Sequence, residues 1–167
     1  MTPAAVREDG PALVLTTKNS KRGDADPGPG IAIKSQPDIR WERCDIKTVA
    51  LLPNVLAKQA ARESGAYEAW LIDTNGCVTE GASTNAWIVT QDGELVTRQT
   101  DNGILAGITR QTLKSLCNAL QLKFVERSFS LAEAMKAQEA FITSATSFVT
   151  PVVKIDGQTV GNGKVGP

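Results

Sequence analysis

Residues 40–47 read Arg40-Trp41-Glu42-Arg43-Cys44-Asp45-Ile46-Lys47. If this stretch is extended, alternate side chains face opposite ways, with Cys44 and Ile46 on one face and Arg43 and Lys47 on the other. An amine that shares a partly buried face with an arginine loses proton affinity, through desolvation and through the like charge. Such a lysine can attack a carbonyl and hold it as a Schiff base. The spacing alone still favours an ordinary solvated edge strand.

The composition limits the classes of protein to which this chain can belong. Its 167 residues are one domain's worth, 41% are hydrophobic and the formal net charge is zero. Neither charge sign dominates, so the sequence suggests neither nucleic acid nor a membrane surface as a partner. No apolar run approaches the length of a membrane span, and no signal-peptide pattern is present. We therefore expect a soluble cytoplasmic protein.

Histidine and cysteine narrow the possible chemistry further. The chain has no histidine, which excludes Ser-His-Asp and Cys-His catalysis. Cys44, Cys77 and Cys117 lack the spacing of metal ligands, so we expect reduced, partly buried thiols and no metal site. Acid–base chemistry must come from lysine, carboxylates, tyrosine or cysteine.

Strands and isolated helices are expected on both sides of residues 40–47. Before it, alternating apolar residues predict strands over 11–18 and 31–36, separated by a loop at 19–30. After it, Pro53 begins a helix over 53–64 that Gly65 ends. Strands follow at 67–73, 86–90, 94–97, 123–129, 140–144 and 148–155.

Two further helices complete the expected elements. One begins within 105–110 and carries Leu113, Leu116, Cys117 and Leu120 on one face. The other begins at the capping box 130–133 and ends near residue 137. This order predicts a mixed α+β fold instead of a regular parallel βαβ array.

Two short segments have compositions that suit a flat, phosphorylated ligand. In residues 78–85, Glu80 is followed by Gly81 and small residues, which let the backbone approach a ligand closely. In residues 105–110, a glycine precedes a helix, whose N-terminal N–H groups suit a phosphate. Taken alone, each pattern is more often an ordinary loop or turn.

Together these motifs resemble one known family. Residues 40–47, followed by Leu51-Leu52-Pro53-Asn54-Val55-Leu56-Ala57-Lys58-Gln59, closely resemble the cofactor-lysine region of D-amino-acid transaminases. These are class IV, fold-type IV pyridoxal-phosphate enzymes. Three more segments resemble the family in the same order: 80–85, 105–110 and 143–146.

The resemblance implies a fold and a domain organisation. It implies the large C-terminal domain of fold type IV, a mixed sheet or pseudo-barrel with flanking helices, over residues 37–167. Residues 1–36 would be the remnant of an N-terminal domain and the interdomain linker. Family members carry a fuller N-terminal domain and a final C-terminal helix, so the chain looks like a fragment. The full-length form is expected to be a homodimer.

The resemblance also implies roles for individual residues. Lys47 would hold pyridoxal 5′-phosphate as a Schiff base, Glu80 would meet its pyridine nitrogen, and Arg40 would contact its phenolate oxygen or the surroundings. Leu105 would cover one face of the ring, and the remaining residues would bind the phosphate or line the site. The implied cofactor-binding residues are Arg40, Lys47, Glu80, Ser83, Thr84, Leu105, Ile108, Thr109, Ser144, Ala145 and Thr146. The chain departs from the pattern at Ala82, where the family often has serine, and at Ala145, where many members have threonine.

The implied reaction transfers the amino group of a D-amino acid of the D-alanine type to a 2-oxo acid. Branched-chain L-aminotransferases and aminodeoxychorismate lyases share the lysine and the glutamate, so they remain alternatives. A non-catalytic remnant that folds without cofactor is a further alternative, because the N-terminal domain of the family supplies an arginine to the phosphate. For that reason we expect the 167-residue chain to bind the cofactor weakly.

Overall fold

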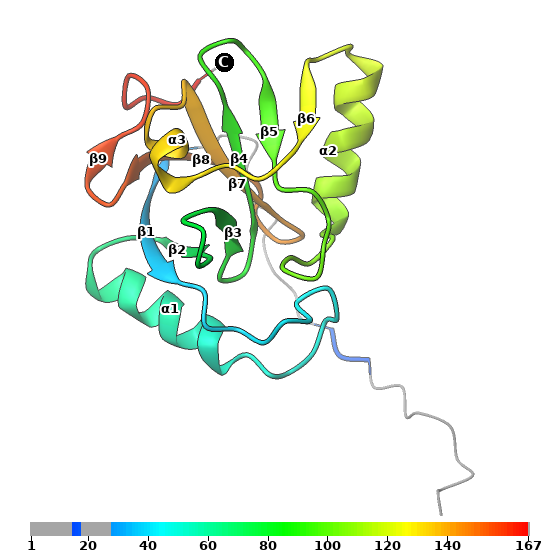
Figure 1. The fold of residues 1–167 in the computed structure, drawn as a ribbon, viewed down its shortest axis with the longest axis vertical. Helices are drawn as coiled ribbons and strands as arrows, with labels where there is room; N and C mark the ends of the chain where they lie inside the picture. The colour runs from blue at the N-terminus through cyan, green and yellow to red at the C-terminus, as the bar shows by residue number, and fades with distance from the viewer. Residues whose placement is uncertain (1–14, 18–27, 167) are drawn as a thin grey trace, which may run out of the picture.

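Residues 15–17 and 28–166 are the part of the chain that the computed structural model describes, shown in Figure 1. Within these residues, nine strands form one sheet that three helices flank. The strands are β1 (Ile31–Pro37), β2 (Glu68–Ile72), β3 (Val78–Gly81), β4 (Asn85–Val89), β5 (Leu95–Thr97), β6 (Phe124–Glu126), β7 (Glu139–Ser144), β8 (Phe148–Ile155) and β9 (Gln158–Thr159). The helices are α1 (Leu52–Glu63), α2 (Ile108–Ala119) and α3 (Leu131–Met135).

The sheet is mixed, as the order of elements in the sequence predicts. Its strands follow the order β3-β2-β1-β8-β7-β4-β5-β6, and β9 pairs with β8. β1 is parallel to both β2 and β8, and β5 is parallel to β6, whereas the remaining pairs are antiparallel. Figure 1 shows α1 beside β1 and β2, and α2 beside β6. The α+β class and the mixed sheet with flanking helices are confirmed.

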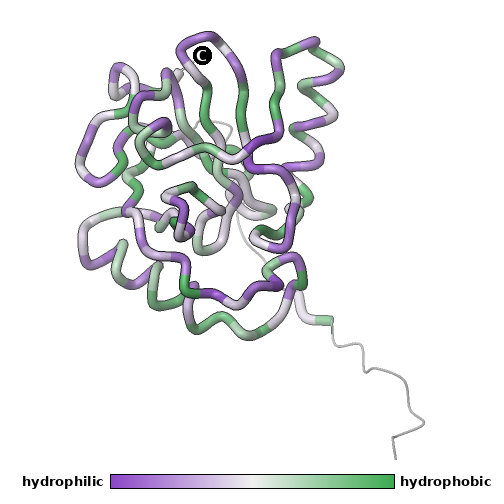
Figure 2. The backbone as a smooth tube through the Cα atoms, viewed as in Figure 1, coloured by the Kyte–Doolittle hydropathy of each residue, from purple (hydrophilic) through white to green (hydrophobic). Residues whose placement is uncertain are grey.

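Large aromatic side chains fill the interior of the sheet. Trp70 on β2 meets Phe129 edge to face, with ring centroids 6.2 Å apart. Trp87 on β4 stacks on Phe141 of β7 at 5.6 Å. Such pairs add to the hydrophobic contribution of the buried area itself. In Figure 2 the hydrophobic colour gathers on the central strands, and the loop tips are hydrophilic.

Helix α1 begins and ends where local sequence signals predict. Pro53 occupies its first turn, where a missing N–H costs nothing. Gly65, just past the C-terminal end, has φ +78°, the left-handed conformation that glycine adopts readily. The N–H of Ala66 then donates to the carbonyl of Ala61 at 2.9 Å, the long bond of a Schellman motif.

The capping box before α3 is also formed, in part. Ser130 Oγ accepts from the Glu133 N–H at 3.0 Å. The Glu133 carboxylate binds Arg127 instead of reaching back to the Ser130 N–H. The helix ends at Met135, two residues earlier than the expected residue 137.

The prediction that residues 40–47 are extended is wrong. The Ile46 N–H donates to the Arg43 carbonyl at 3.1 Å, which closes a turn. The Cys44 N–H donates to the carbonyl of Asn102 at 2.8 Å, so the segment is held by a distant loop and not by a neighbouring strand. Arg43 and Asp45 therefore meet through two hydrogen bonds of 2.9 Å, both side chains in solvent.

Three other expectations need correction. Leu116 and Leu120 of α2 are exposed, and only Leu113 and Cys117 of the expected apolar face pack against the sheet. The strand expected over 123–129 is limited to β6. Of the strand expected over 11–18, only residues 15–17 are described, and they have no regular structure.

The division into 1–36 and 37–167 stays a prediction, because most of 1–36 lies outside the described residues. β1 lies in the middle of the sheet, between β2 and β8. Among residues 15–17 and 28–166, no helix has the length and apolarity that crossing a bilayer requires.

Candidate active site

An open cavity of about 680 Å³ lies between α1, the loop after β3, the start of α2 and the turn between β7 and β8. The site residues expected from the sequence meet there, with the exception of Arg40. Those that line the cavity are Lys47, Glu80, Ser83, Thr84, Leu105, Ile108, Thr109, Ser144, Ala145 and Thr146.

Glu80 is a buried carboxylate at the inner wall of this cavity. Its side chain is 8% exposed and accepts from Arg40 Nη1 at 2.5 Å. Its other oxygen accepts from Asn85 Nδ2 and from the Leu105 N–H, both at 3.1 Å. Burial raises the pKa of Glu80 to about 7, although the Arg40 guanidinium and the Leu105 N–H act in the opposite direction. Glu80 can therefore change its charge near neutral pH.

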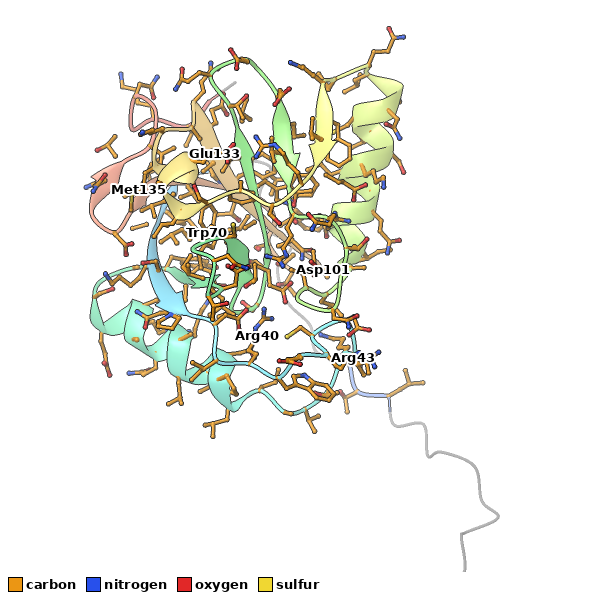
Figure 3. The ribbon with its side chains drawn as sticks, in the orientation of Figure 1. Arg40, Arg43, Trp70, Asp101, Glu133 and Met135 are labelled. Carbon is orange, nitrogen blue, oxygen red and sulfur yellow. The ribbon has the colours of Figure 1, made fainter. Side chains whose placement is uncertain are left out.

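Arg40 lies behind Glu80 and away from the cavity. Its side chain is 5% exposed, and its remaining donors bind Asp38 and the Gly103 carbonyl. Although burial opposes the change, hydrogen bonds from Arg40 and Thr79 lower the pKa of Asp38. Figure 3 shows Arg40 close to the strands and Arg43 farther out on the same segment. Direct contact between Arg40 and a cofactor stays a prediction.

Lys47 and Lys58 both line the cavity, and their surroundings differ. Lys47 is exposed, and among the described residues no hydrogen bond or ion pair engages its Nζ. Lys58 Nζ, on α1, is 2.7 Å from the carboxylate of Glu68. The cavity thus offers one amine that is unengaged within the described residues and one that is held.

The start of α2 forms another wall of the cavity. Its N-cap is Gly107, and no side chain caps the helix. Within the described part of the chain, no partner is recorded for the N–H groups of Ile108 and Thr109. A helix start with unpaired N–H groups favours an anion, through both hydrogen bonds and the helix dipole.

The turn between β7 and β8 approaches the same helix start. Thr109 Oγ1 donates to the Ser144 carbonyl at 2.8 Å, which joins α2 to the turn. Ser144 Oγ accepts from the Ser147 N–H at 3.0 Å and lies 3.3 Å from Thr146 Oγ1. Ala145 and Thr146 are exposed at the mouth of the cavity. The turn therefore brings hydroxyl and amide groups close to the anion-binding end of α2.

The loop after β3 supplies an unpaired hydroxyl. Thr84 Oγ1 is buried and has no hydrogen-bond partner, and Thr84 lines the cavity. A Cβ on Gly81 would collide with this same oxygen, so only glycine leaves room for it. A buried polar atom without a partner costs free energy, which a ligand group in the cavity would remove.

Three cavity residues were not expected from the sequence. Asn85 donates to Glu80 and to the Leu105 carbonyl. Asn54 Nδ2 donates to the Ala82 carbonyl at 2.8 Å, which holds the loop after β3 against α1. Lys58 was expected on a solvated face. Asn85 could have been found because it ends the 80–85 motif, but no local signal marked Asn54 or Lys58.

The arrangement suits one kind of ligand. An unengaged amine, a buried carboxylate of adjustable charge and an anion-binding helix end can together hold a phosphorylated nitrogen heterocycle that bears an aldehyde. In residues 15–17 and 28–166, no group of three or more Cys, Asp or Glu side chains is placed to hold a metal ion.

Sequence comparison identifies relatives of the chain. A family model described as amino-transferase class IV matches residues 2–155. A D-alanine aminotransferase of Bacillus licheniformis is 44% identical over 138 residues, which are 83% of this chain and 48% of the relative. One from Staphylococcus haemolyticus is 43% identical over 158 residues, 94% of this chain and 55% of the relative. The chain thus spans about half the length of these relatives.

Solved structures with a similar fold include two branched-chain amino acid aminotransferases. The enzyme of Escherichia coli has a TM-score of 0.70 and 30% identity, covering 83% of this chain and 48% of that chain. A second enzyme, from the organism abbreviated T.th., was solved with pyridoxamine 5′-phosphate. It has a TM-score of 0.77 and 27% identity, covering 87% of this chain and 49% of that chain. Both support the fold described above.

Proposed function

The chain belongs to the class IV aminotransferase family, and we propose that it forms the cofactor-binding part of a D-amino-acid aminotransferase of the D-alanine type. The cofactor would be pyridoxal 5′-phosphate, and the substrates would be a D-amino acid and a 2-oxo acid. The two relatives named above are D-alanine aminotransferases at 43–44% identity, and one structural neighbour holds pyridoxamine 5′-phosphate.

One observation carries this proposal: Lys47, Glu80 and the start of α2 line a single cavity. Each matches a different group of the cofactor. Lys47 suits the aldehyde, Glu80 the ring nitrogen, and the N–H groups of Ile108 and Thr109 the phosphate. The unpaired Thr84 hydroxyl offers a further donor to a bound phosphate or substrate group.

When bound, pyridoxal phosphate would supply an aldehyde and an electron-withdrawing ring that stabilises negative charge on the substrate Cα. Lys47 would form the covalent link through Nζ. Once displaced by the incoming amine, Lys47 would move a proton between the substrate Cα and the cofactor C4′. An amine that no other side chain holds can make both movements.

Glu80 would hold a proton at the ring nitrogen. A carboxylate whose pKa lies near 7 can share a proton with a pyridine nitrogen without a large mismatch in proton affinity. Asn85 and the Leu105 N–H, which bind the other oxygen, would keep the carboxylate in one orientation. Leu105 itself lines the cavity, so its side chain is available to cover one face of the ring.

A branched-chain L-aminotransferase is the second candidate, because the structural neighbours named above carry that activity in their names. Their identity to the chain is 27–30%, whereas that of the D-alanine aminotransferases is 43–44%. The higher identity favours the D-amino acid.

Assembly and location are also proposals. We propose a homodimer for the whole protein, because α1 and the residues before it expose several large apolar side chains. The described thiols of Cys44, Cys77 and Cys117 are free, which fits a reducing compartment such as the cytoplasm. We retain 37–167 as the cofactor-binding domain.

Incubation with pyridoxal phosphate, followed by borohydride and peptide mass spectrometry, tests the proposal. Borohydride makes even a weak adduct permanent, so the test does not depend on tight binding. We expect the label on Lys47, no label there in Lys47→Ala, and an unchanged circular dichroism spectrum for that variant. Labelling that is equal in wild type and Lys47→Ala, with the label on other lysines, would contradict the proposal. Turnover of D-alanine against L-leucine then decides between the two substrates.

A further inference from the structure

The cavity contains two lysines, and an aldehyde in it could meet either amine. Lys47 and Lys58 both contribute to its lining. Their difference lies in Glu68, whose carboxylate receives Lys58 Nζ at 2.7 Å. No such partner engages Lys47 within the described residues. The choice of reactive lysine therefore has a structural cause that can be named.

Glu68 is an unusual residue for the first position of β2, because its side chain is 0% exposed. One oxygen accepts from the Ala69 N–H at 2.8 Å. The other accepts from Lys58 Nζ and from Ser83 Oγ, both at 2.7 Å. The carboxylate thus joins α1 and the loop after β3 to the edge of the cavity.

Releasing Lys58 from this carboxylate would be costly. Lys58 is 24% exposed and provides the charge that compensates the buried Glu68. Removing one partner of such a pair leaves an uncompensated buried charge, which is strongly unfavourable. The ammonium also lies 5.1 Å from the centroid of the Tyr67 ring, a second favourable contact that it would lose.

We propose that Glu68 determines which lysine reacts: by holding Lys58, it leaves Lys47 as the amine of the cavity that is free to meet an aldehyde. This inference rests on the proposed function, because it assumes an aldehyde ligand. It assigns Glu68 a role in specificity, and Glu68 itself touches no reacting atom.

The step in question is the condensation of an amine with an aldehyde. The lone pair of a neutral Nζ adds to the aldehyde carbon, the amine loses its protons, and the oxygen leaves as water with formation of a C=N bond. Borohydride then delivers hydride to that carbon and leaves a stable secondary amine. Lys58 must first separate from Glu68 to begin this sequence, whereas Lys47 need not.

The first test compares pyridoxal phosphate labelling of the wild-type chain and Glu68→Gln at substoichiometric cofactor. Glutamine has nearly the shape of glutamate and no charge, so it leaves Lys58 without a counter-ion. The fraction of label on Lys58 should rise about tenfold or more, since a hydrogen bond between charged groups contributes at least that factor. A label on Lys58 as large as that on Lys47 in the wild type would overturn the proposal.

Asp156→Asn is the matched control. Asp156 holds Lys34 at 3.0 Å as Glu68 holds Lys58, but Lys34 does not line the cavity. This variant should free Lys34 without changing the label on Lys58. An equal rise of Lys58 labelling in both variants would show a general loosening of the fold and would overturn the role of Glu68.

The second test needs no cofactor. Acetic anhydride, at trace amounts, reports how freely each lysine reacts in the protein alone. Lys58 should acetylate about tenfold more slowly than Lys47 in the wild type and approach the rate of Lys47 in Glu68→Gln. Similar wild-type rates would overturn the proposal even if the variant failed to fold. The expected rates without a pyridoxal label on Lys47 would instead reject the proposed function and leave the role of Glu68 intact.

Discussion

Arg40 is the residue whose surroundings differ most from what a sequence motif suggests. The motif implies contact with a cofactor, but the guanidinium binds Asp38 and Glu80 and is 5% exposed. The pair of carboxylates around one arginine explains how a charged side chain can be buried there. Its structural effect is to fix the position of Glu80 at the wall of the cavity.

Arg40→Met should therefore destabilise the fold. It leaves Glu80 and Asp38 buried without their counter-charge, and removal of one partner from such a cluster costs about 3–5 kcal/mol. The same change should raise the pKa of Glu80 further, because the guanidinium opposes the effect of burial. Urea denaturation at pH 8 measures the loss. Arg43→Met is the control, since Arg43 pairs with Asp45 in solvent and should leave the unfolding free energy unchanged within error.

Glu80 should make the stability of the cofactor-free chain depend on pH. Its pKa is about 7 in the folded chain and near the ordinary 4.5 when unfolded, so the folded form binds the proton more tightly. This contribution is fully present below pH 4.5 and is lost as the pH rises through 7. Relative to Glu80→Gln, the wild type should lose on the order of 1–3 kcal/mol between pH 4.5 and 8. A constant difference between the two proteins across this range would show that Glu80 does not titrate there.

At the scale of elements, α2 shows how a helix can have an apolar pattern that the structure uses only in part. Its N-terminal end faces the cavity, and Cys117 packs with Trp87 and Leu95. Leu116 and Leu120 have the spacing of the same face, yet they are 51% and 67% exposed. The short edge strand β6 is too small to cover the whole stripe.

Cys117→Ser and Leu120→Ser should consequently differ. A hydroxyl at the buried position 117, without a dedicated partner, costs about 1–3 kcal/mol. The same hydroxyl at position 120 replaces an exposed side chain, and such substitutions usually stay within about 0.5 kcal/mol. Thermal or urea unfolding of the two variants measures both. A larger loss for Leu120→Ser would mean that α2 packs through the other half of its apolar stripe.

At the scale of the whole molecule, one surface is more apolar than a soluble monomer usually presents. We call it the α1 surface, and Figure 2 shows its hydrophobic colour along and before this helix. Several neighbouring side chains there are at least half exposed, and contiguous patches of this kind mark contact surfaces. The α1 surface consists of Val49, Leu51, Leu52, Val55 and Leu56.

The chain should therefore associate with itself through the α1 surface. Val49 and Leu52 are 96% and 69% exposed, so serine at both positions removes apolar area without opening the core. The double variant should sediment as a smaller species than the wild type at the same micromolar concentration. Leu116→Ser with Leu120→Ser is the control on α2. Association that only this second pair reduces would place the contact on α2 instead.

Local chemistry in the sequence was enough for much of the fold. Pro53 and Gly65 bound α1 because one needs no N–H and the other tolerates a positive φ, and both effects act within a few residues. The motifs at 80–85, 105–110 and 143–146 also indicated segments that meet at one cavity. Short motifs carry their own backbone geometry, so they can be read before the partners are known.

The tertiary structure alone decided the contacts between distant residues. Arg40 and Glu80 lie 40 positions apart, and their bond is part of what keeps residues 40–47 from continuing as an extended strand. Lys58 looked like a solvated lysine until folding brought the buried Glu68 to it. Which charges pair and which apolar residues stay exposed depends on the surfaces that meet after folding, and no periodicity within one segment contains that information.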